Sequence, residues 1–126
     1  GETAQTLPAL STQVPLVRLA WARSGDKGNH SNIGVIARRP EYLPWLRRAL
    51  TPEHVASYFS HVLDAETGRV TRYELPGLHA LNFLLENALG GGGMASLRAD
   101  PQGKAFAQQL LDMPIDLPTD LLQEQA

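Results

Sequence analysis

Two short apolar runs near the N-terminus show a strand-like pattern, and a polar segment separates them. In the first run, residues 17–23, the side chains are apolar at every second position from Val17 to Trp21. The second run, residues 33–37, is apolar and rich in β-branched side chains. Both patterns are typical of strands. The polar segment, residues 24–34, is expected to be a loop, and since a plain hairpin needs only about two to five loop residues, we expect a function to explain the excess.

The middle of the chain predicts two helices. Leu43, Leu46 and Leu50 recur at helical spacing. A second helix is indicated by Thr51-Pro52-Glu53, which supplies an N-cap, a proline at the first helical position and an acid in the first turn. An apolar stripe follows, and residues 64–68 are expected to form a turn.

The second half of the chain continues the alternation of strands and helices. Four more elements are expected, in this order: a strand over residues 69–75, a helix over residues 78–89, a short strand over residues 94–98 and a helix that begins at Asp100-Pro101. The helix over 78–89 is indicated by leucines at helical spacing, with His79, Asn82 and Glu86 on a polar face. The whole order predicts an α+β sandwich, with helices on one face of a mainly antiparallel sheet.

Composition limits the classes of protein. A chain of 126 residues fits one domain, and a net charge of -2 without a basic stripe argues against nucleic-acid binding. The absence of cysteine excludes disulfides, thiolate catalysis and cysteine-ligated metals. The sequence has neither an apolar run of membrane-spanning length nor a signal-peptide pattern. We therefore expect a soluble, cytoplasmic protein with no membrane or nucleic-acid partner.

The two ends differ from the centre. Residues 1–15 are rich in Thr, Gln, Ala, Pro and Ser, and they begin with Gly rather than Met, as a domain excised from a longer protein would. We expect residues 1–15 to be a flexible linker or tail, residues 16–114 the folded domain, and residues 115–126 a partly mobile C-terminal tail.

Three sequence blocks resemble a known family. They are Arg23-Ser24-Gly25-Asp26-Lys27-Gly28 with Asn32-Ile33-Gly34-Val35-Ile36-Ala37-Arg38, then Tyr73-Glu74-Leu75-Pro76-Gly77 with Ala80-Leu81-Asn82-Phe83, and then residues 90–93 with Ser96-Leu97-Arg98 and Asp100-Pro101-Gln102-Gly103-Lys104. On these blocks, residues 16–114 resemble the AtuA-like ferredoxin-fold domain. That domain is the C-terminal part of AtuA-type proteins of acyclic terpene utilisation, and it also occurs as small stand-alone proteins.

The resemblance implies a ferredoxin-like sandwich and a link to the degradation of acyclic terpenoids such as citronellol and geraniol, whose intermediates are acyl-CoA thioesters. It implies no defined reaction. Where the family pattern often has an acid after the second glycine of the first block, this chain has Asn29-His30-Ser31. A literal ferredoxin-like order would be βαββαβ, and the two adjacent strands predicted first depart from it.

The polar segment holds the main site candidates. The residues Gly25-Asp26-Lys27-Gly28 could present backbone N–H groups and Lys27 to a phosphate or carboxylate, although they lack the order of a Walker A loop. The same residues suit an ordinary turn in which the glycines adopt positive φ and Asp26 closes an Asx-turn. His30 is a candidate general base, because imidazole titrates near neutral pH, or a bystander.

Other polar residues allow two interpretations each. Asp26 and Glu74 could act as a carboxylate pair if they lay within several ångströms, or as partners of arginines. The glycine run 90–93 suits close approach of a ligand or a neighbouring subunit, or a linker. His54 and His61 are two helical turns apart and cannot ligate one metal together. We expect no metal site and no covalently bound cofactor.

The candidate residues fall into two sets. The candidate catalytic residues are Asp26, Lys27 and His30. The candidate residues for binding a substrate or anion are Ser24, Gly25, Asp26, Lys27, Gly28, Asn32, Asn82, Gly91, Gly92 and Arg98.

Three functions are compatible with the sequence. The first is a component of an enzyme or complex of acyclic terpenoid or acyl-CoA catabolism, in which a second copy or a larger partner domain completes an anion or substrate site on residues 24–34. It is favoured because a pure interface rarely needs an acid, a lysine, a histidine and two asparagines on one loop. The second is a non-catalytic oligomerisation or docking module, and the third is a stand-alone binder of a small ligand such as an acyl-CoA. Whether the chain is an enzyme stays open.

Overall fold

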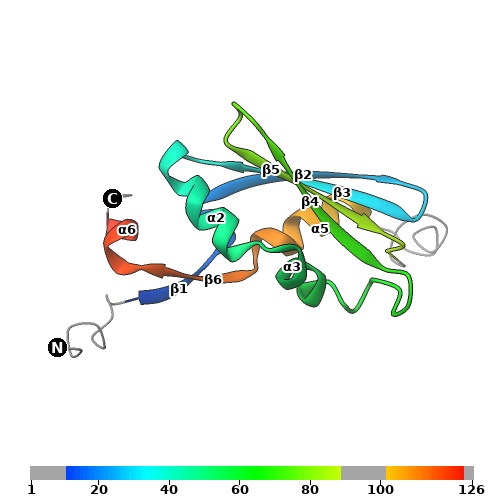
Figure 1. Cartoon of the computed structure of the whole chain (residues 1–126). Coiled ribbons are helices and arrows are strands. Elements are labelled where there is room, and N and C mark those ends of the chain that lie inside the picture. Colours follow the sequence, from blue (N-terminus) through cyan, green and yellow to red (C-terminus); the bar gives the residue numbers. More distant parts are fainter. Residues whose placement is uncertain (1–10, 89–101, 124–126) are drawn as a thin grey trace.

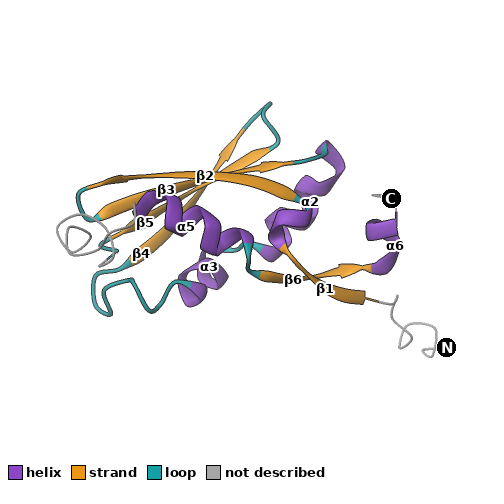
Figure 2. Cartoon of the chain, turned by 180° about the vertical axis from the view of Figure 1, so that it is seen from behind, coloured by secondary structure: helices purple, strands orange, loops and turns teal. Residues whose placement is uncertain are grey.

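A computed structural model describes residues 11–88 and 102–123 of the chain. In chain order its elements are β1 (Ser11–Pro15), η1 (Leu16–Arg18), β2 (Ala20–Lys27), β3 (His30–Ala37), η2 (Pro40–Tyr42), α2 (Leu43–Ala49), α3 (Pro52–Tyr58), β4 (Arg69–Leu75), β5 (Ala80–Glu86), α5 (Gln102–Leu111), β6 (Pro114–Pro118) and α6 (Thr119–Gln123). Four of the strands form an antiparallel sheet in the order β2-β3-β5-β4. The helices α2, α3 and α5 lie on one side of it in both views (Figures 1 and 2). The predicted α+β sandwich is confirmed.

The main sheet consists of two hairpins side by side. β2 pairs with β3, β4 pairs with β5, and the pairing of β3 with β5 joins the two hairpins. The helices α2 and α3 connect the hairpins, and α5 packs chiefly against β2. The four strands of the main sheet therefore come as two adjacent pairs, β2 with β3 and β4 with β5, and helices separate the pairs. This order differs from βαββαβ at both pairs.

The polar segment 24–34 is part of the first hairpin, so the prediction of a long loop is wrong. β2 and β3 pair from Ala20 opposite Ala37 to Lys27 opposite His30, which leaves a loop of Gly28 and Asn29. Gly28, at the first loop position, has a φ of 65°, as type II′ hairpin loops require. The segment looked like a loop because its side chains face solvent or a neighbouring element instead of the apolar core.

The helix predicted over residues 78–89 is also wrong, because the central part of this segment forms strand β5. Leu81, Phe83 and Leu85 are fully buried and alternate along β5 toward the helices. Their buried face has the period of two that a strand requires. The helical spacing did not distinguish the two structures, because Leu81 and Leu85, four positions apart, share a face in a strand as they would in a helix, and Leu78 lies in the turn before β5.

Among the other predicted elements in the described part of the chain, the strand predicted over residues 17–23 is confirmed only from Ala20 onward, because Leu16–Arg18 form η1, and the rest are confirmed. α2 and α3 occupy the expected segments, and the backbone N–H of His54 donates to Oγ1 of the N-cap Thr51 at 3.0 Å. β4 covers residues 69–75, and α5 follows Asp100-Pro101 and buries Phe106 and Leu110. The strand predicted over residues 94–98 lies outside the described residues.

The core fills the space between the main sheet and the helices. Its largest fully buried side chains are Tyr42, Phe59, Phe83, Phe106, Leu16, Leu19, Ile33, Leu46, Leu50, Leu81, Leu85 and Leu110. Phe59 of the α3 C-cap and Phe106 of α5 meet edge to face, with ring centroids 5.6 Å apart. The core is thus continuous beneath the sheet.

A second, two-stranded sheet joins segments from the two ends of the chain. β1 pairs with β6 in antiparallel register, from Ser11 opposite Pro118 to Pro15 opposite Pro114. α6 follows β6 directly. The paired segments reach into the two ranges expected to be tails, so the ordered unit begins before residue 16 and continues past residue 114.

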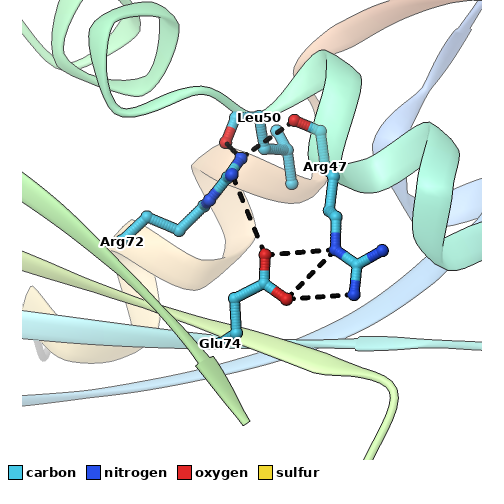
Figure 3. A network of polar contacts seen from close by, with 4 residues as sticks. All are labelled: Arg47, Leu50, Arg72 and Glu74. Atoms are coloured by element: carbon cyan, nitrogen blue, oxygen red, sulfur yellow. Dashed lines mark hydrogen bonds and ion pairs between the residues drawn. The ribbon is translucent and has the colours of Figure 1, made fainter. Parts of the chain in front are cut away.

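Arg72 ties the edge strand β4 to the end of α2 (Figure 3). Its Nη1 group donates to the backbone carbonyls of Arg47 and Leu50, at 2.9 and 3.0 Å. Glu74 accepts two hydrogen bonds from Nε of Arg47, each 3.1 Å, and lies 3.9 Å from Nη2 of Arg72. A cation that binds the last carbonyls of a helix also complements its dipole, so this network fixes α2 against the sheet.

Candidate functional site

One face of the main sheet packs on the helices, and the other carries no described helix (Figure 1). Alternate residues of a strand share a face, and directly paired residues lie on the same face. The strand register assigns these residues to the face away from the helices, called here the open face: Trp21, Arg23, Gly25, Lys27, His30, Asn32, Gly34, Ile36, Arg69, Thr71, Tyr73, Leu75, Ala80, Asn82, Leu84 and Glu86.

The open face exposes large apolar side chains. Trp21 is 49% exposed, Tyr73 49% and Ile36 39%. The remaining strongly exposed large apolar side chain in the described part of the chain, Leu78, lies in the turn between β4 and β5. Sequence analysis placed Trp21 on a strand but did not single out this surface. The alternation of Val17, Leu19 and Trp21 predicted one shared face, which is wrong because Leu19 is fully buried before β2 begins and Trp21 is exposed.

Two amide side chains lie at the middle of the open face, and Arg23 of β2 lies directly opposite Gly34 on the same face. Nδ2 of Asn32 donates a hydrogen bond to Oδ1 of Asn82, 3.3 Å away. A Cβ atom on Gly25 would lie 3.6 Å from Oδ1 of Asn32, and one on Gly34 would lie 3.8 Å from Oδ1 of Asn82. The two amides thus lie beside two positions that have no side chain. The structure brings together Gly25, Asn32 and Asn82 of the predicted binding residues.

Two other predicted residues point toward the helices and make structural contacts. The backbone N–H of Ala107 in α5 donates to Oγ of Ser24 at 3.1 Å. The hydroxyl of Ser31, which is only 1% exposed, donates to Oδ1 of Asp26 at 3.1 Å. The contact of Ser24 joins β2 to α5, and the contact of Asp26 joins β2 to β3. Both residues therefore have a structural role.

The candidate catalytic residues gather at the tip of the first hairpin. A hollow of about 370 Å³ is lined there by Gly25, Asp26, Lys27, His30, Ser31, Asn32 and Leu84. Nδ1 of His30 accepts a hydrogen bond of 3.2 Å from the backbone N–H of Asn87, which leaves Nε2 as the nitrogen available to a ligand. The role of Asp26, Lys27 and His30 in catalysis, and that of Gly28 in binding, stay predictions.

Some candidates fall elsewhere. Gly91, Gly92 and Arg98 lie outside the described residues, and so does the side chain of Lys104. Glu74 is on β4 and Asp26 on β2, the two edge strands of the sheet. Since neighbouring strands are about 4.8 Å apart, these carboxylates are separated by at least about 14 Å. They cannot act as a pair, and Glu74 is instead the ion-pair partner of Arg47, at 3.0 Å.

Two ionisable side chains away from the open face have shifted pKa values. Burial, and to a smaller extent the carboxylate of Asp112, raises the pKa of Tyr58, whose hydroxyl donates to the carbonyl of Gln109 at 2.6 Å. The backbone N–H and the hydroxyl of Thr67, followed by the backbone N–H of Glu66, lower the pKa of Asp64. The pKa shift of Tyr58 thus comes mainly from its burial, and that of Asp64 from hydrogen bonds within its own turn.

The described residues contain no group of three histidine, aspartate or glutamate side chains placed to hold a metal ion. No helix within residues 11–88 or 102–123 is long and apolar enough to cross a membrane.

A comparison with protein-family models matches residues 14–116 to the AtuA ferredoxin-like domain. This range includes both hairpins, the helices beneath them and the residues at the centre of the open face. The chain belongs to the AtuA ferredoxin-like domain family. The resemblance based on three sequence blocks is therefore confirmed. No curated protein and no solved structure matches this AtuA ferredoxin-like domain.

Proposed function

We propose that this AtuA ferredoxin-like domain is an assembly module, which joins two copies of its chain through their open faces. The observation that carries the proposal is the exposure of Trp21, Ile36 and Tyr73 together on one sheet face. Large apolar side chains grouped on a surface mark interaction sites, and aromatic residues are enriched at interfaces. Family membership supports a place for the module in an enzyme or complex of acyclic terpenoid or acyl-CoA catabolism.

The size of the open face suits a second copy. Four strands about 4.8 Å apart and about seven residues long span roughly 19 Å by 23 Å. Two such faces contribute roughly 900 Å² of flat area, and more once the relief of the side chains is included. This value approaches the ~1,000 Å² or more that specific protein interfaces bury.

The centre of the face is complementary to itself. The hydrogen bond between Asn32 and Asn82 uses one polar side-chain atom of each residue. The other two atoms, Oδ1 of Asn32 and Nδ2 of Asn82, make no hydrogen bond with a described residue. An isologous interface places the same patch of both copies together. Each copy then offers one acceptor and one donor to the other. The charged residues Lys27, Arg69 and Glu86 lie at one end of the face, and Arg23 lies on the edge strand β2, so these charges are at the border of the face, where a polar rim is expected.

The module is tested by placing a charge at the centre of the open face. Gly34 has space for a side chain, so Gly34→Arg should fold while burying a guanidinium in the interface. Gln108→Arg adds the same charge on the exposed side of α5 and is the matched control. Sedimentation velocity should show a dimer for the unmodified chain and for Gln108→Arg, and a monomer for Gly34→Arg. A chain that stays monomeric near 100 μM, or a dimeric Gly34→Arg variant, would contradict the proposal.

The hollow at the hairpin tip supports a second candidate function, an anion or acyl-CoA site. Its supporting observation is that Asp26, Lys27 and His30 line one hollow of about 370 Å³. Thermal-shift titration with coenzyme A and with phosphate tests it, because a ligand at about 100 times its Kd stabilises a protein by about 2.7 kcal/mol. The shift should disappear in Lys27→Ala. An equal shift in that variant, or none in the unmodified chain, excludes this site.

A further inference from the structure

A second hollow lies at the opposite end of the β2–β3 hairpin from Lys27 and His30. It has a volume of about 530 Å³ and is lined by Val17, Arg18, Trp21, Arg38, Arg39 and Tyr42. These residues come from η1, the start of β2, the segment after β3, and η2. The nearest lining residues of the two hollows on β2 are Trp21 and Gly25, and their four-residue separation corresponds to about 13 Å along the strand. The hollow is therefore distinct from the predicted anion site.

Two of its arginines are held in place by the fold. Nε of Arg38 donates to the carbonyl of Val17 at 2.8 Å, and its guanidinium carbon lies 4.8 Å from the centroid of the Trp21 ring. The guanidinium carbon of Arg39 lies 5.8 Å from the centroid of the Tyr42 ring. A guanidinium that is already oriented loses less conformational entropy when it binds an anion.

The guanidinium groups of Arg38 and Arg39 face no acid on the walls of this hollow. No carboxylate lines it, and no described aspartate or glutamate forms an ion pair with Arg38 or Arg39. Arg48 provides a contrast, since its guanidinium lies 4.9 Å from the centroid of the Trp45 ring in a separate hollow that includes Asp116. The same arginine–tryptophan stack thus occurs twice, once beside an acid and once beside further arginines.

Tyr42 lies beside the hollow with an almost fully buried side chain. The residue is 1% exposed, and its hydroxyl has no hydrogen-bond partner among the described residues. Buried hydroxyl groups in native proteins nearly always have a partner. Because this hydroxyl is itself buried, it is an unsatisfied group of the core and not a ligand contact.

We propose that this hollow binds a small organic diphosphate of the nucleoside diphosphate class. The planar forks of Arg38 and Arg39 match phosphate oxygens in bidentate geometry. Trp21, half exposed on the wall, offers an aromatic surface to a flat base. The volume lies within the range of small-molecule sites. The site shares Trp21 with the assembly module but goes beyond it, because Arg39 and Tyr42 lie after β3 and outside the sheet.

Isothermal titration calorimetry at fixed ionic strength tests the site with ADP, pyrophosphate and inorganic phosphate. ADP should bind at least fivefold more tightly than pyrophosphate, and inorganic phosphate should be the weakest. Arg39→Gln should weaken ADP binding at least tenfold. Arg48→Gln, which changes the matching arginine over Trp45, should alter it less than twofold.

Arg39→Gln is the deciding variant, because Arg38→Gln also removes the hydrogen bond to Val17. Circular dichroism should confirm that both variants are folded. No saturable heat with any of the three probes would overturn the proposal, and so would ADP binding no tighter than pyrophosphate or an equal loss in Arg48→Gln. The Gly34→Arg chain should still bind ADP, so that failure of the diphosphate site and failure of the dimer can be told apart.

Discussion

Asn32 and Asn82, separated by 50 positions in the sequence, share a side-chain hydrogen bond of 3.3 Å across the two central strands of the sheet. They are a diagonal pair, because Asn82 lies directly opposite Gly34 and Asn32 lies directly opposite Leu84. Diagonal neighbours on one face of a sheet are within reach of longer side chains. The two amides therefore form a polar pair at the middle of the open face.

Replacing either amide should affect assembly more than folding. In Asn32→Ala or Asn82→Ala, the free energy of unfolding should fall by less than about 1 kcal/mol, because the lost hydrogen bond is exposed. The dimer should weaken at least tenfold, since both amides lie at the proposed interface centre. Urea unfolding at low concentration and sedimentation equilibrium separate the two effects. Unchanged dimerisation in both variants would remove the amides from the interface.

Arg72 should matter more to stability than its acidic neighbour. Arg72→Gln removes a charged donor from the carbonyls of Arg47 and Leu50 and should lower the free energy of unfolding by about 1.5–3 kcal/mol. The side chain of Glu74 is 44% exposed, so Glu74→Gln should cost less than about 1 kcal/mol. Chemical denaturation of both variants gives the comparison. Equal losses would mean that the ion pair, and not the contact with the helix end, dominates.

Ser24→Ala should reveal whether this residue acts in structure or in binding. Loss of the hydrogen bond from the backbone N–H of Ala107 should lower the free energy of unfolding by about 0.5–1.5 kcal/mol. Because the Ser24 side chain faces α5, any thermal shift given by coenzyme A should keep its size. A stable variant that no longer responds to coenzyme A would instead assign Ser24 to the predicted anion site.

Asp64 should contribute to the acid sensitivity of the fold. Its pKa is lowered, chiefly by Thr67, so the folded state binds this proton less readily than the unfolded state. The contribution is complete above the ordinary aspartate value of 3.8 and disappears as the pH falls through the folded pKa. Carbon-13 NMR titration should place the carboxyl below that value, and Thr67→Val should raise it. Stability of Asp64→Asn should vary less with pH in this range.

The sequence predicted α2, α3 and α5 well, because their signals are local. The side chain of Thr51 caps α3 as its position before Pro52 indicated, and Phe106 and Leu110 are buried as their spacing indicated. Helix caps and apolar stripes depend on residues a few positions apart. The fold class followed from these elements and from the strands predicted over residues 17–23, 33–37 and 69–75.

The extent of the sheet could not be predicted in the same way. Asp26 and Asn32 have low strand propensity, and they become strand residues because β2 and β3 pair along their whole length. Leu84 gave β5 an apolar residue on both faces, which concealed its alternation. Tertiary contacts decided both segments, and short-range patterns do not contain that information.

The same limit applied to the candidate site. The sequence identified Asn32 and Asn82 separately, and only the register of β3 with β5 places them together. The arginine hollow combines η1 with residues 38 and 39, which are distant in sequence from it. Two consecutive arginines after a strand do not by themselves predict a binding site.

The pairing of β1 with β6 has a consequence for the order in which the chain folds. Ser11 and Pro118 are directly opposite one another although nearly the whole described chain lies between them. Closing so long a loop is entropically costly, and contacts between distant residues form slowly. We therefore expect the two hairpins and their helices to assemble first and the small sheet to close last. The strands that join the two ends of the fold would then also be the first to separate when it opens.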